Sequence, residues 1–178
     1  MLTKIDKRKI IVLDASAFIA GFEPLSIQDI QYSVPEVKHE LISNSLPWTR
    51  FDAAVENGRL KVKTPRADYV KKVKTSSKTA GDLLFLSEAD QQILALALEL
   101  KDVGCNPQIV TDDYSIQNVA NQLGIGFASL MTFGIRYQFR WTLYCPACYR
   151  KYSSDYKPKR CEICGTELKR KPLGKKPI

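Results

Sequence analysis

Four short segments of this 178-residue chain each place a carboxylate where a strand is about to become a helix, or just inside a helix. The acidic residues are Asp14, Glu40, Asp90 and the adjacent pair Asp112 and Asp113. The carboxyl ends of parallel strands lie at the same edge of a sheet, so acids at these ends are gathered at one place. This arrangement therefore restricts the chain to an α/β fold. Gathered carboxylates are typical of sites that bind divalent metal ions and hydrolyse phosphodiesters.

The first segment is an apolar, largely β-branched run over residues 10–13, preceded by Lys9, that stops at Asp14 and is followed by small residues. A run without polar alternation is typical of a strand buried on both faces. We predict that it forms the first, central strand of a parallel sheet. Ligands of open α/β sheets bind outside the carboxyl ends of the strands, which is where Asp14 is expected.

The second and third segments begin helices. Pro35 suits the first turn of a helix and Glu40 follows about one turn later, so its carboxylate is expected to point back toward the crevice. Ser87 is a typical N-cap with Asp90 in the first turn, and an almost wholly apolar helix follows. Asp90 is therefore expected at the rim of the core.

The fourth segment is again a strand, an acidic turn and an amphipathic helix. Residues 108–111 predict the strand, Asp112 and Asp113 the turn, and Gly124 the C′ position of the helix. Residues 125–128 then predict a final short strand. The two acids are expected at the same edge as Asp14.

Each acid also has an ordinary structural explanation. The four aspartates suit helix caps, and Glu40 suits a solvated helix position. Taken singly, the structural explanation is favoured for each residue. Taken together, a metal site is favoured, because acids gathered at one sheet edge repel one another unless a cation neutralises them.

The C-terminal region carries two Cys-x-x-Cys pairs separated by twelve residues, namely Cys145, Cys148, Cys161 and Cys164. Two such pairs predict a tetrahedral zinc site, and because four thiolates leave no open position the zinc is expected to be structural. We disfavour two disulfides, because the N-terminus lacks the apolar run of a signal peptide. The fifth cysteine, Cys105, is predicted to be a plain thiol in a loop.

Positive charge is concentrated at the C-terminal end. Residues 131–178 carry 12 Lys and Arg against 3 Asp and Glu, whereas residues 1–130 carry 15 against 16. The whole net charge of +8 therefore arises from the C-terminal segment. A basic region of this kind predicts binding to a polyanion.

Aromatic residues alternate with this charge. On an extended strand Tyr137, Phe139 and Trp141 share one face. Arg136 and Arg140 share the other face. We favour a packing role for the aromatic face over base stacking. The residues predicted to contact nucleic acid are Arg136, Arg140, Arg150, Lys151, Tyr152, Lys159 and Arg160.

The length suits one compact domain and one small module. The predicted segments are an α/β domain over 1–130, a linker strand over 131–140, a β-rich zinc ribbon over 141–171 and a basic tail over 172–178. The clusters of Lys and Arg at 169–171 and 175–176 predict a mobile arm without fixed structure.

Between residues 63 and 82 a basic helix is expected to run into a flexible loop. Asp82 either adds a carboxylate to the acidic site or, as we favour, forms a turn. No apolar run is long enough to cross a membrane.

The four acidic segments resemble the four motifs of PIN-domain ribonucleases. The matching stretches are Ile-Val-Leu-Asp14-Ala-Ser, Pro-Glu-Val-Lys-His-Glu40-Leu, Leu-Ser-Glu-Ala-Asp90-Gln and Val-Thr-Asp-Asp113-Tyr-Ser. The resemblance implies a parallel sheet flanked by helices, and one or two magnesium or manganese ions held by these acids. The family's Thr-any-Asp pattern selects Asp113, with Asp112 left open as the alternative ligand.

The mechanism implied is hydrolysis by a metal-bound water. An all-carboxylate site suits magnesium or manganese better than zinc, because these ions prefer oxygen ligands. A route through the 2′-hydroxyl normally needs two side chains that titrate near neutral pH, and the chain has a single histidine, His39. We assign His39 to helix surface or packing.

A PIN-like domain followed by a four-cysteine ribbon and a basic tail resembles the Nob family, endonucleases that mature the 3′ end of small-subunit ribosomal RNA. The resemblance includes Thr-Ala-Gly-Asp82 and Tyr-Gln-Phe-Arg140-Trp. It implies cleavage of single-stranded pre-rRNA on a pre-small-subunit particle, leaving a 3′-hydroxyl and a 5′-phosphate. The short chain is more similar to archaeal than to eukaryotic members, which implies a cytoplasmic enzyme.

Two other functions stay open. A non-cleaving RNA-binding assembly factor would dock through the ribbon, and its RNA binding would survive loss of Asp14. A general PIN-type ribonuclease, toxin-like or acting in quality control, would cut single strands broadly, although small toxin nucleases of this fold generally lack a zinc ribbon. A DNA nuclease is disfavoured, but no residue excludes it, because recognition of a 2′-hydroxyl leaves no legible motif.

Overall fold

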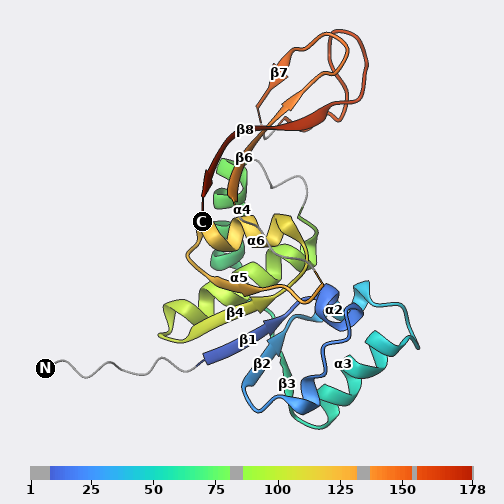
Figure 1. The fold of residues 1–178 in the computed structure, drawn as a ribbon, viewed down its shortest axis with the longest axis vertical. Helices are drawn as coiled ribbons and strands as arrows, with labels where there is room; N and C mark the ends of the chain where they lie inside the picture. The colour runs from blue at the N-terminus through green and yellow to red at the C-terminus, as the bar shows by residue number, and fades with distance from the viewer. Residues whose placement is uncertain (1–8, 81–85, 132–136, 154–155, 178) are drawn as a thin grey trace, which may run out of the picture.

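The computed structural model describes residues 9–80, 86–131, 137–153 and 156–177. An α/β domain is followed by a slender antiparallel ribbon that extends away from it (Figure 1). The elements of the α/β domain are β1 (Lys9–Leu13), α1 (Ala15–Ile19), the 3-10 helix η1 (Pro24–Ser26), β2 (Ile30–Ser33), α2 (Pro35–Glu40), α3 (Leu46–Glu56), β3 (Leu60–Val62), α4 (Ala67–Ala80), α5 (Glu88–Asp102), β4 (Asn106–Val110), α6 (Tyr114–Gln122) and β5 (Gly126–Ala128). The C-terminal strands are β6 (Tyr137–Tyr144), β7 (Lys151–Tyr152) and β8 (Lys169–Pro177).

Five parallel strands form one sheet in the order β3-β2-β1-β4-β5, with β1 at its centre. Ile10 pairs with Ile30 on one side of β1 and with Pro107 on the other. The chain first adds strands on the β2 side of β1 and later on the β4 side, so the order reverses between β1 and β4. Such a switch point opens a crevice at the carboxyl ends of the two strands. The prediction of a central first strand in a parallel sheet is confirmed.

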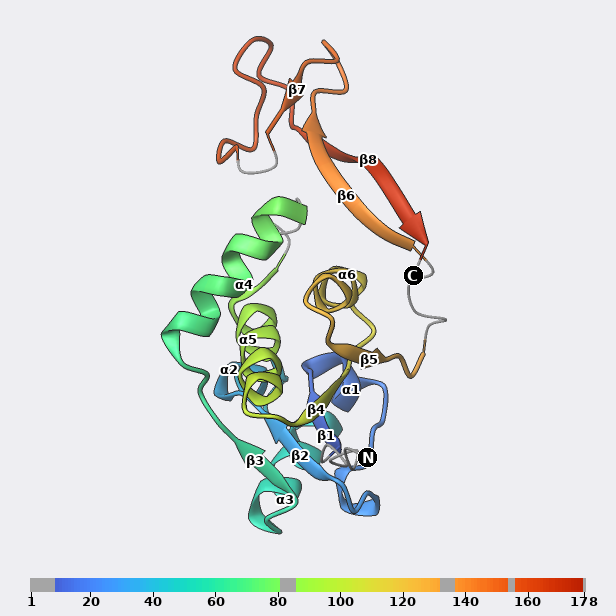
Figure 2. The ribbon, with the colours of Figure 1, turned by 90° about the vertical axis from the view of Figure 1, so that its left-hand side faces the viewer.

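Helix α5 supplies the centre of the core, where Ile93, Leu94 and Leu96 are fully buried. It packs on β1 and β4, and α4 packs on α5 as an outer layer, while α1 packs on α3 (Figure 2). A helix this apolar is stable only where other elements cover it, which the layers on both sides of α5 provide. Among the described residues, no helix has both the length and the apolar character needed to cross a bilayer.

The end of α6 is closed as the sequence predicts. Gly124 adopts a φ of +62°, and the amide of Ile125 donates to the carbonyl of Ala120 at 2.9 Å. The ammonium of Lys101 donates to the carbonyls of Leu123 and Gly124, each at 2.8 Å. This cation therefore ties the last turn of α5 to the end of α6, where helix carbonyls lack partners.

The C-terminal ribbon is a three-stranded antiparallel sheet in the order β7-β6-β8. Tyr137 pairs with Pro177 and Tyr144 pairs with Lys169, so β6 and β8 run together over nearly their whole length. The prediction of a mobile arm at residues 169–171 and 175–176 is therefore wrong. Pairing with β6 gives the backbone of this basic segment its hydrogen bonds, and nothing in the charge pattern reveals such a partner.

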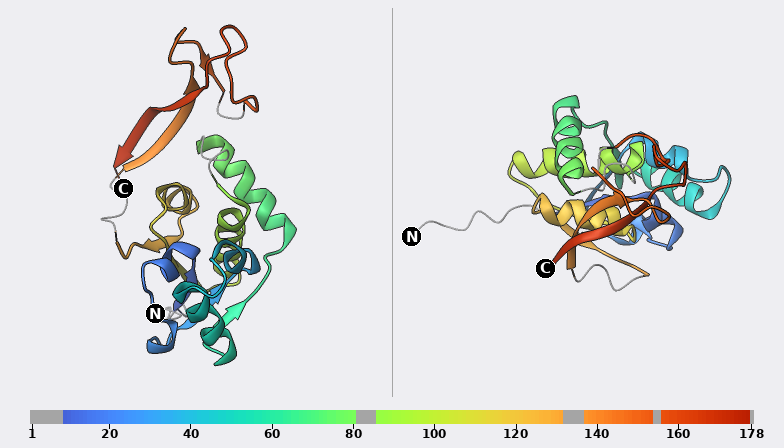
Figure 3. Two further views of the ribbon diagram at one scale, coloured as in Figure 1. Left: turned by 90° about the vertical axis from the view of Figure 1, so that its right-hand side faces the viewer. Right: turned by 90° about the horizontal axis from the view of Figure 1, so that it is seen from above.

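The base of the ribbon is held by the α/β domain, because β6 contacts both α4 and α6. The left-hand view of Figure 3 shows the ribbon continuing outward from this contact. The predicted segment limits at residues 140/141 and 171/172 fall inside β6 and β8. The basic helix predicted between residues 63 and 82 is α4, whereas Asp82 lies outside the described residues.

Candidate active site and zinc centre

Asp14 lies where β1 gives way to α1, and its side chain is buried. Its Oδ2 accepts hydrogen bonds from the Ser16 hydroxyl at 2.8 Å and from the Thr111 hydroxyl at 2.9 Å. Burial raises the pKa of Asp14, and the two hydroxyls partly offset that effect. Asp14 occupies the N-cap position of α1, but its carboxylate makes no side-chain capping hydrogen bond to that helix.

Asp112 and Asp113 follow β4 but contact different surroundings. Asp113 caps α6 by accepting a hydrogen bond from the amide two residues further on, at 2.6 Å. Asp112 Oδ1 instead accepts hydrogen bonds from the Ser129 hydroxyl and from the amides of Leu130 and Met131, the last two at 3.1 and 3.0 Å. Asp112 is thus bonded to the segment that leaves β5, whereas Asp113 is bonded to its own helix.

Ser87 joins the remaining two acids. Its hydroxyl donates to Glu40 Oε1 at 2.9 Å and accepts a hydrogen bond from the Asp90 amide at 3.1 Å. The Ser87 amide donates to Asp90 Oδ2 at 2.7 Å, which completes a capping box at the start of α5. Asp90 therefore does have the capping role suggested for it, and the same serine holds both acids.

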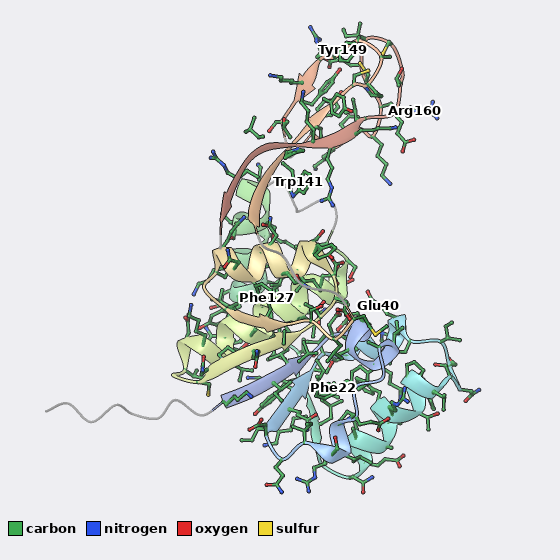
Figure 4. The ribbon with its side chains drawn as sticks, in the orientation of Figure 1. Phe22, Glu40, Phe127, Trp141, Tyr149 and Arg160 are labelled. Carbon is green, nitrogen blue, oxygen red and sulfur yellow. The ribbon has the colours of Figure 1, made fainter. Side chains whose placement is uncertain are left out.

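The four acids are coupled electrostatically, because the charges of Asp14 and Asp113 act on both Glu40 and Asp90. Burial is the largest cause of the raised pKa values of Glu40 and Asp90, and the charges of Asp14 and Asp113 raise both further. For Asp90 the pKa rises to about 6. Figure 4 labels Glu40 at this edge of the sheet. A cluster whose members disfavour one another's charge is stabilised by a bound cation.

The donors of this cluster are carboxylate oxygens, which suit a hard divalent cation. Within the described ranges, its ligand oxygens are spread more widely than those of a closed cage, since no three of them all lie within 4.8 Å of one another. This spacing suits an ion that keeps several of its waters.

The four cysteines predicted to bind zinc come together at the far end of the ribbon. The sulfurs of Cys145 and Cys164 lie 3.4 Å apart, those of Cys148 and Cys161 lie 3.5 Å apart, and all four lie within 4.8 Å of one another. Tetrahedral zinc with bonds of about 2.3 Å requires sulfurs roughly 3.8 Å apart. The donor set and its spacing therefore fit a closed structural zinc site.

Tyr152 supports this centre from inside the ribbon. Its hydroxyl lies 2.9 Å from the sulfur of Cys161. The pKa of Cys161 is lowered to about 6, and this contact is the main cause. The tyrosine ring is buried together with Leu143, and it packs on Tyr156 with ring centroids 4.5 Å apart. Hydrogen bonds to ligand sulfurs fix their orientation toward a metal.

Comparison with known proteins decides the family. A family model described as the PIN domain of ribonuclease matches residues 11–100. Endoribonuclease Nob1 of Methanothermobacter thermautotrophicus is 39% identical over 160 residues, which cover 90% of this chain and 91% of that protein. Endoribonuclease Nob1 of Methanocaldococcus jannaschii is 40% identical over 163 residues, or 92% of this chain and 78% of that protein. The chain belongs to the Nob1 family of PIN-domain endoribonucleases.

The match to the Nob1 relatives covers about nine tenths of the chain, which is more than the α/β domain alone, so it extends into the C-terminal ribbon. Ribonuclease VapC1 of Thermoplasma acidophilum is also similar, at 35% identity over 161 residues, or 90% of this chain and 77% of that protein. The PIN-type α/β fold and the β-rich zinc ribbon predicted from the sequence are confirmed.

Most side chains predicted to contact nucleic acid are exposed. They are Arg140, Arg150, Lys151, Lys159 and Arg160. Tyr152 is a correction: it is only 8% exposed and packs against the zinc centre, so its ring is not available for stacking on a base. Arg136 lies outside the described residues, as do the side chains of Tyr137 and Phe139.

Three other sequence predictions have a clear outcome in the structure. His39 is an exposed residue of α2, in agreement with its assignment to the helix surface. Cys105 lies between α5 and β4 as a free thiol, partly buried against the core. Trp141 is partly buried, and the guanidinium of Arg170 lies 4.4 Å from its ring centroid.

The sequence analysis missed the hydroxyl groups that hold the acids of this site in place. Ser16 accepts a hydrogen bond from the Asp112 amide at 3.0 Å in addition to its bond to Asp14. Thr111 accepts one from the Asp113 amide at 3.1 Å. Both hydroxyls therefore join β1 to the turn after β4. The signal in the sequence was a hydroxyl residue two positions from each strand-end acid.

Proposed function

We propose that this protein is a metal-dependent single-strand endoribonuclease that matures the 3′ end of small-subunit ribosomal RNA. The observation that carries the proposal is the meeting of Asp14, Asp113, Glu40 and Asp90 at the switch point of the sheet, in a chain of the Nob1 family. In this proposal Asp112 is not a metal ligand, because its carboxylate binds the Leu130 amide in the segment that leaves β5. The acting ions in this proposal are one or two Mg²⁺ or Mn²⁺.

Asp14, Asp90 and Asp113 would hold the ions, and Glu40 would complete the site. Divalent ions supply an activated water and stabilise charge on the attacking and leaving oxygens. Thr111 and Ser16 hold the Asp14 carboxylate by two hydrogen bonds, so its orientation is set before substrate arrives. Ser87 does the same for Glu40 and Asp90. The products expected are a 3′-hydroxyl and a 5′-phosphate.

In this proposal the zinc ribbon and its basic strands hold the RNA while the nuclease domain cuts it. Exposed Arg140, Lys151, Lys159 and Arg160 supply positive charge along the module. The natural substrate would be single-stranded pre-rRNA near the small-subunit 3′ end, carried on a pre-small-subunit particle. The proposal places this reaction in the cytoplasm.

The test is cleavage of an end-labelled single-stranded RNA that spans a small-subunit rRNA 3′ end, with Mn²⁺, by the intact protein and by Asp14→Asn. A single cut that needs both Asp14 and metal, with a 3′-hydroxyl at the upstream product, supports the proposal. Thr142→Ala, which removes a hydroxyl bonded to the Tyr152 carbonyl in the ribbon, is a control outside the site and should still cut.

The similarity to VapC1 favours one competing function, a PIN ribonuclease with broad single-strand specificity. Scattered cuts that depend on Asp14 and metal would select it. RNA binding without any cut that depends on Asp14 would instead select a non-cleaving assembly factor.

A further inference from the structure

The two zinc-binding turns of this chain follow the same backbone path. The amide of Tyr149 donates to the carbonyl of Cys145 at 2.9 Å, and the amide of Gly165 donates to the carbonyl of Cys161 at the same distance. The residue after the second cysteine of each pair is left-handed, with a φ of +59° at Tyr149 and +70° at Gly165. Tyr149 and Gly165 therefore occupy equivalent positions.

The two residues differ in the steric strain that this left-handed conformation causes. Glycine adopts a left-handed conformation without a steric penalty, whereas a residue with a Cβ is strained there. A bulky aromatic residue at positive φ is a clear outlier among non-glycine residues. The second turn, with Gly165, shows that the zinc site itself does not require a side chain at this position.

Packing does not explain the tyrosine either. The side chain of Tyr149 is 75% exposed, while the buried cluster of the zinc module is formed by Leu143, Cys145, Tyr152 and Cys161. Figure 4 shows Tyr149 at the end of the ribbon far from the nuclease domain. Strain that is retained where packing gains nothing indicates a functional role for the side chain.

The surroundings indicate the ligand. Arg150 and Lys151 follow directly and are exposed, and Arg150 also forms an ion pair with Glu162 at 2.9 Å. An open aromatic face beside cations on a basic module is the combination that binds unpaired bases, with stacking on the ring and phosphates on the cations. An apolar protein partner would be expected to meet a less charged surface.

We propose that Tyr149 is a stacking platform for an unpaired base of the RNA substrate. The inference deepens the proposed function and rests on it for the identity of the ligand. The ring would meet the base from the tip of the zinc module, so the contact reads single-stranded character and not base sequence.

The test uses the full zinc-loaded chain with Asp14→Asn, so that RNA is bound and not cut, and a fluorescently labelled unstructured RNA. In this background Tyr149→Gly and Tyr149→Asn remove the ring and suit the left-handed backbone, whereas Tyr149→Phe keeps the ring. Stacking predicts an affinity loss of about 5- to 150-fold for Gly and Asn. Tyr149→Phe should bind within twofold of the parent, and binding to a blunt RNA duplex should be unchanged throughout.

A matched control is Ile163→Ala, which truncates the exposed apolar side chain of the other zinc turn and should leave RNA affinity unchanged. The zinc content of Tyr149→Gly should equal that of the parent, and its thermal midpoint should be equal or higher because strain is relieved. A weaker affinity that comes with lost zinc or a lower midpoint would overturn the inference, because the ring would then be structural.

Unchanged single-strand affinity in both Tyr149→Gly and Tyr149→Asn would also overturn it. The parallel cleavage assay with Asp14 intact separates this result from the proposed function. Absence of metal-dependent cleavage there would reject the nuclease proposal, while the binding comparison would still decide whether Tyr149 stacks on RNA.

Discussion

The hydroxyl of Thr111 donates a buried hydrogen bond of 2.9 Å to Oδ2 of Asp14, across 97 positions of sequence. This bond joins the carboxyl end of β4 to that of β1 at the switch point of the sheet. Because the same hydroxyl accepts from the Asp113 amide, one threonine positions both strand-end acids. A buried carboxylate depends on such donors, since it has lost its hydration.

Replacing Thr111 by Val keeps the shape of the side chain and removes the hydroxyl. We expect a stability loss of about 1–3 kcal/mol, because a buried acceptor loses a donor. Metal-dependent cleavage should fall at least tenfold, since Asp14 is no longer held in place. Urea unfolding and single-turnover cleavage measure the two effects. Thr111→Ser is the control that should retain most of both, and equal losses in the two variants would contradict the role of the hydroxyl.

The two adjacent aspartates should differ sharply on substitution. Asp113→Asn is expected to lower cleavage at least a hundredfold and to weaken Mn²⁺ binding, because it removes a charge from the metal site. Asp112→Asn should retain Mn²⁺ binding, since that side chain bonds the Ser129 hydroxyl and the Leu130 amide. Calorimetry of Mn²⁺ binding separates the two. A greater loss of Mn²⁺ affinity in Asp112→Asn would reverse the assignment.

The stability of the protein freed of magnesium and manganese should depend on pH through Asp90. Its folded-state pKa of about 6 lies above the ordinary value of 3.8. The contribution of Asp90 to the free energy of unfolding is therefore complete below pH 3.8 and is lost as the pH rises through 6. Asp90→Asn should consequently stabilise this form by about 2–3 kcal/mol at pH 7.5 and by little at pH 4. Urea unfolding at both pH values checks this, and a difference that grows toward acid pH would contradict it.

Removal of zinc should unfold the end of the ribbon and leave the α/β core folded, because the small cysteine cluster depends on metal while the sheet has its own core. Cys161→Ser should therefore lose zinc and bind RNA more weakly, whereas Cys105→Ser should keep one zinc per chain. Metal analysis and amide NMR spectra measure this. Retained zinc in Cys161→Ser, or a collapse of signals from β1 and β4, would be the contrary result.

Much of the fold was predictable because its signals are local. The apolar run before Asp14, the Ser87 cap and Gly124 each act within a few residues, and each was located correctly. The segment over residues 169–177 was not predictable, because its structure depends on a partner strand more than twenty residues earlier in the chain. Tyr152 was misassigned for the same reason, since its burial depends on neighbours that fold around the zinc centre.

The sequence by itself determined the candidate site residues: four acid-bearing segments and two cysteine pairs, recognisable from residue type and spacing. Only the tertiary structure decided how these residues are divided among tasks. It bonds Asp112 to the Leu130 amide and Asp113 to the first turn of α6. It also makes Ser87 the shared partner of Glu40 and Asp90. The physical reason is that side-chain hydrogen bonds between distant segments depend on the packing of whole elements, which residue spacing along the chain does not encode.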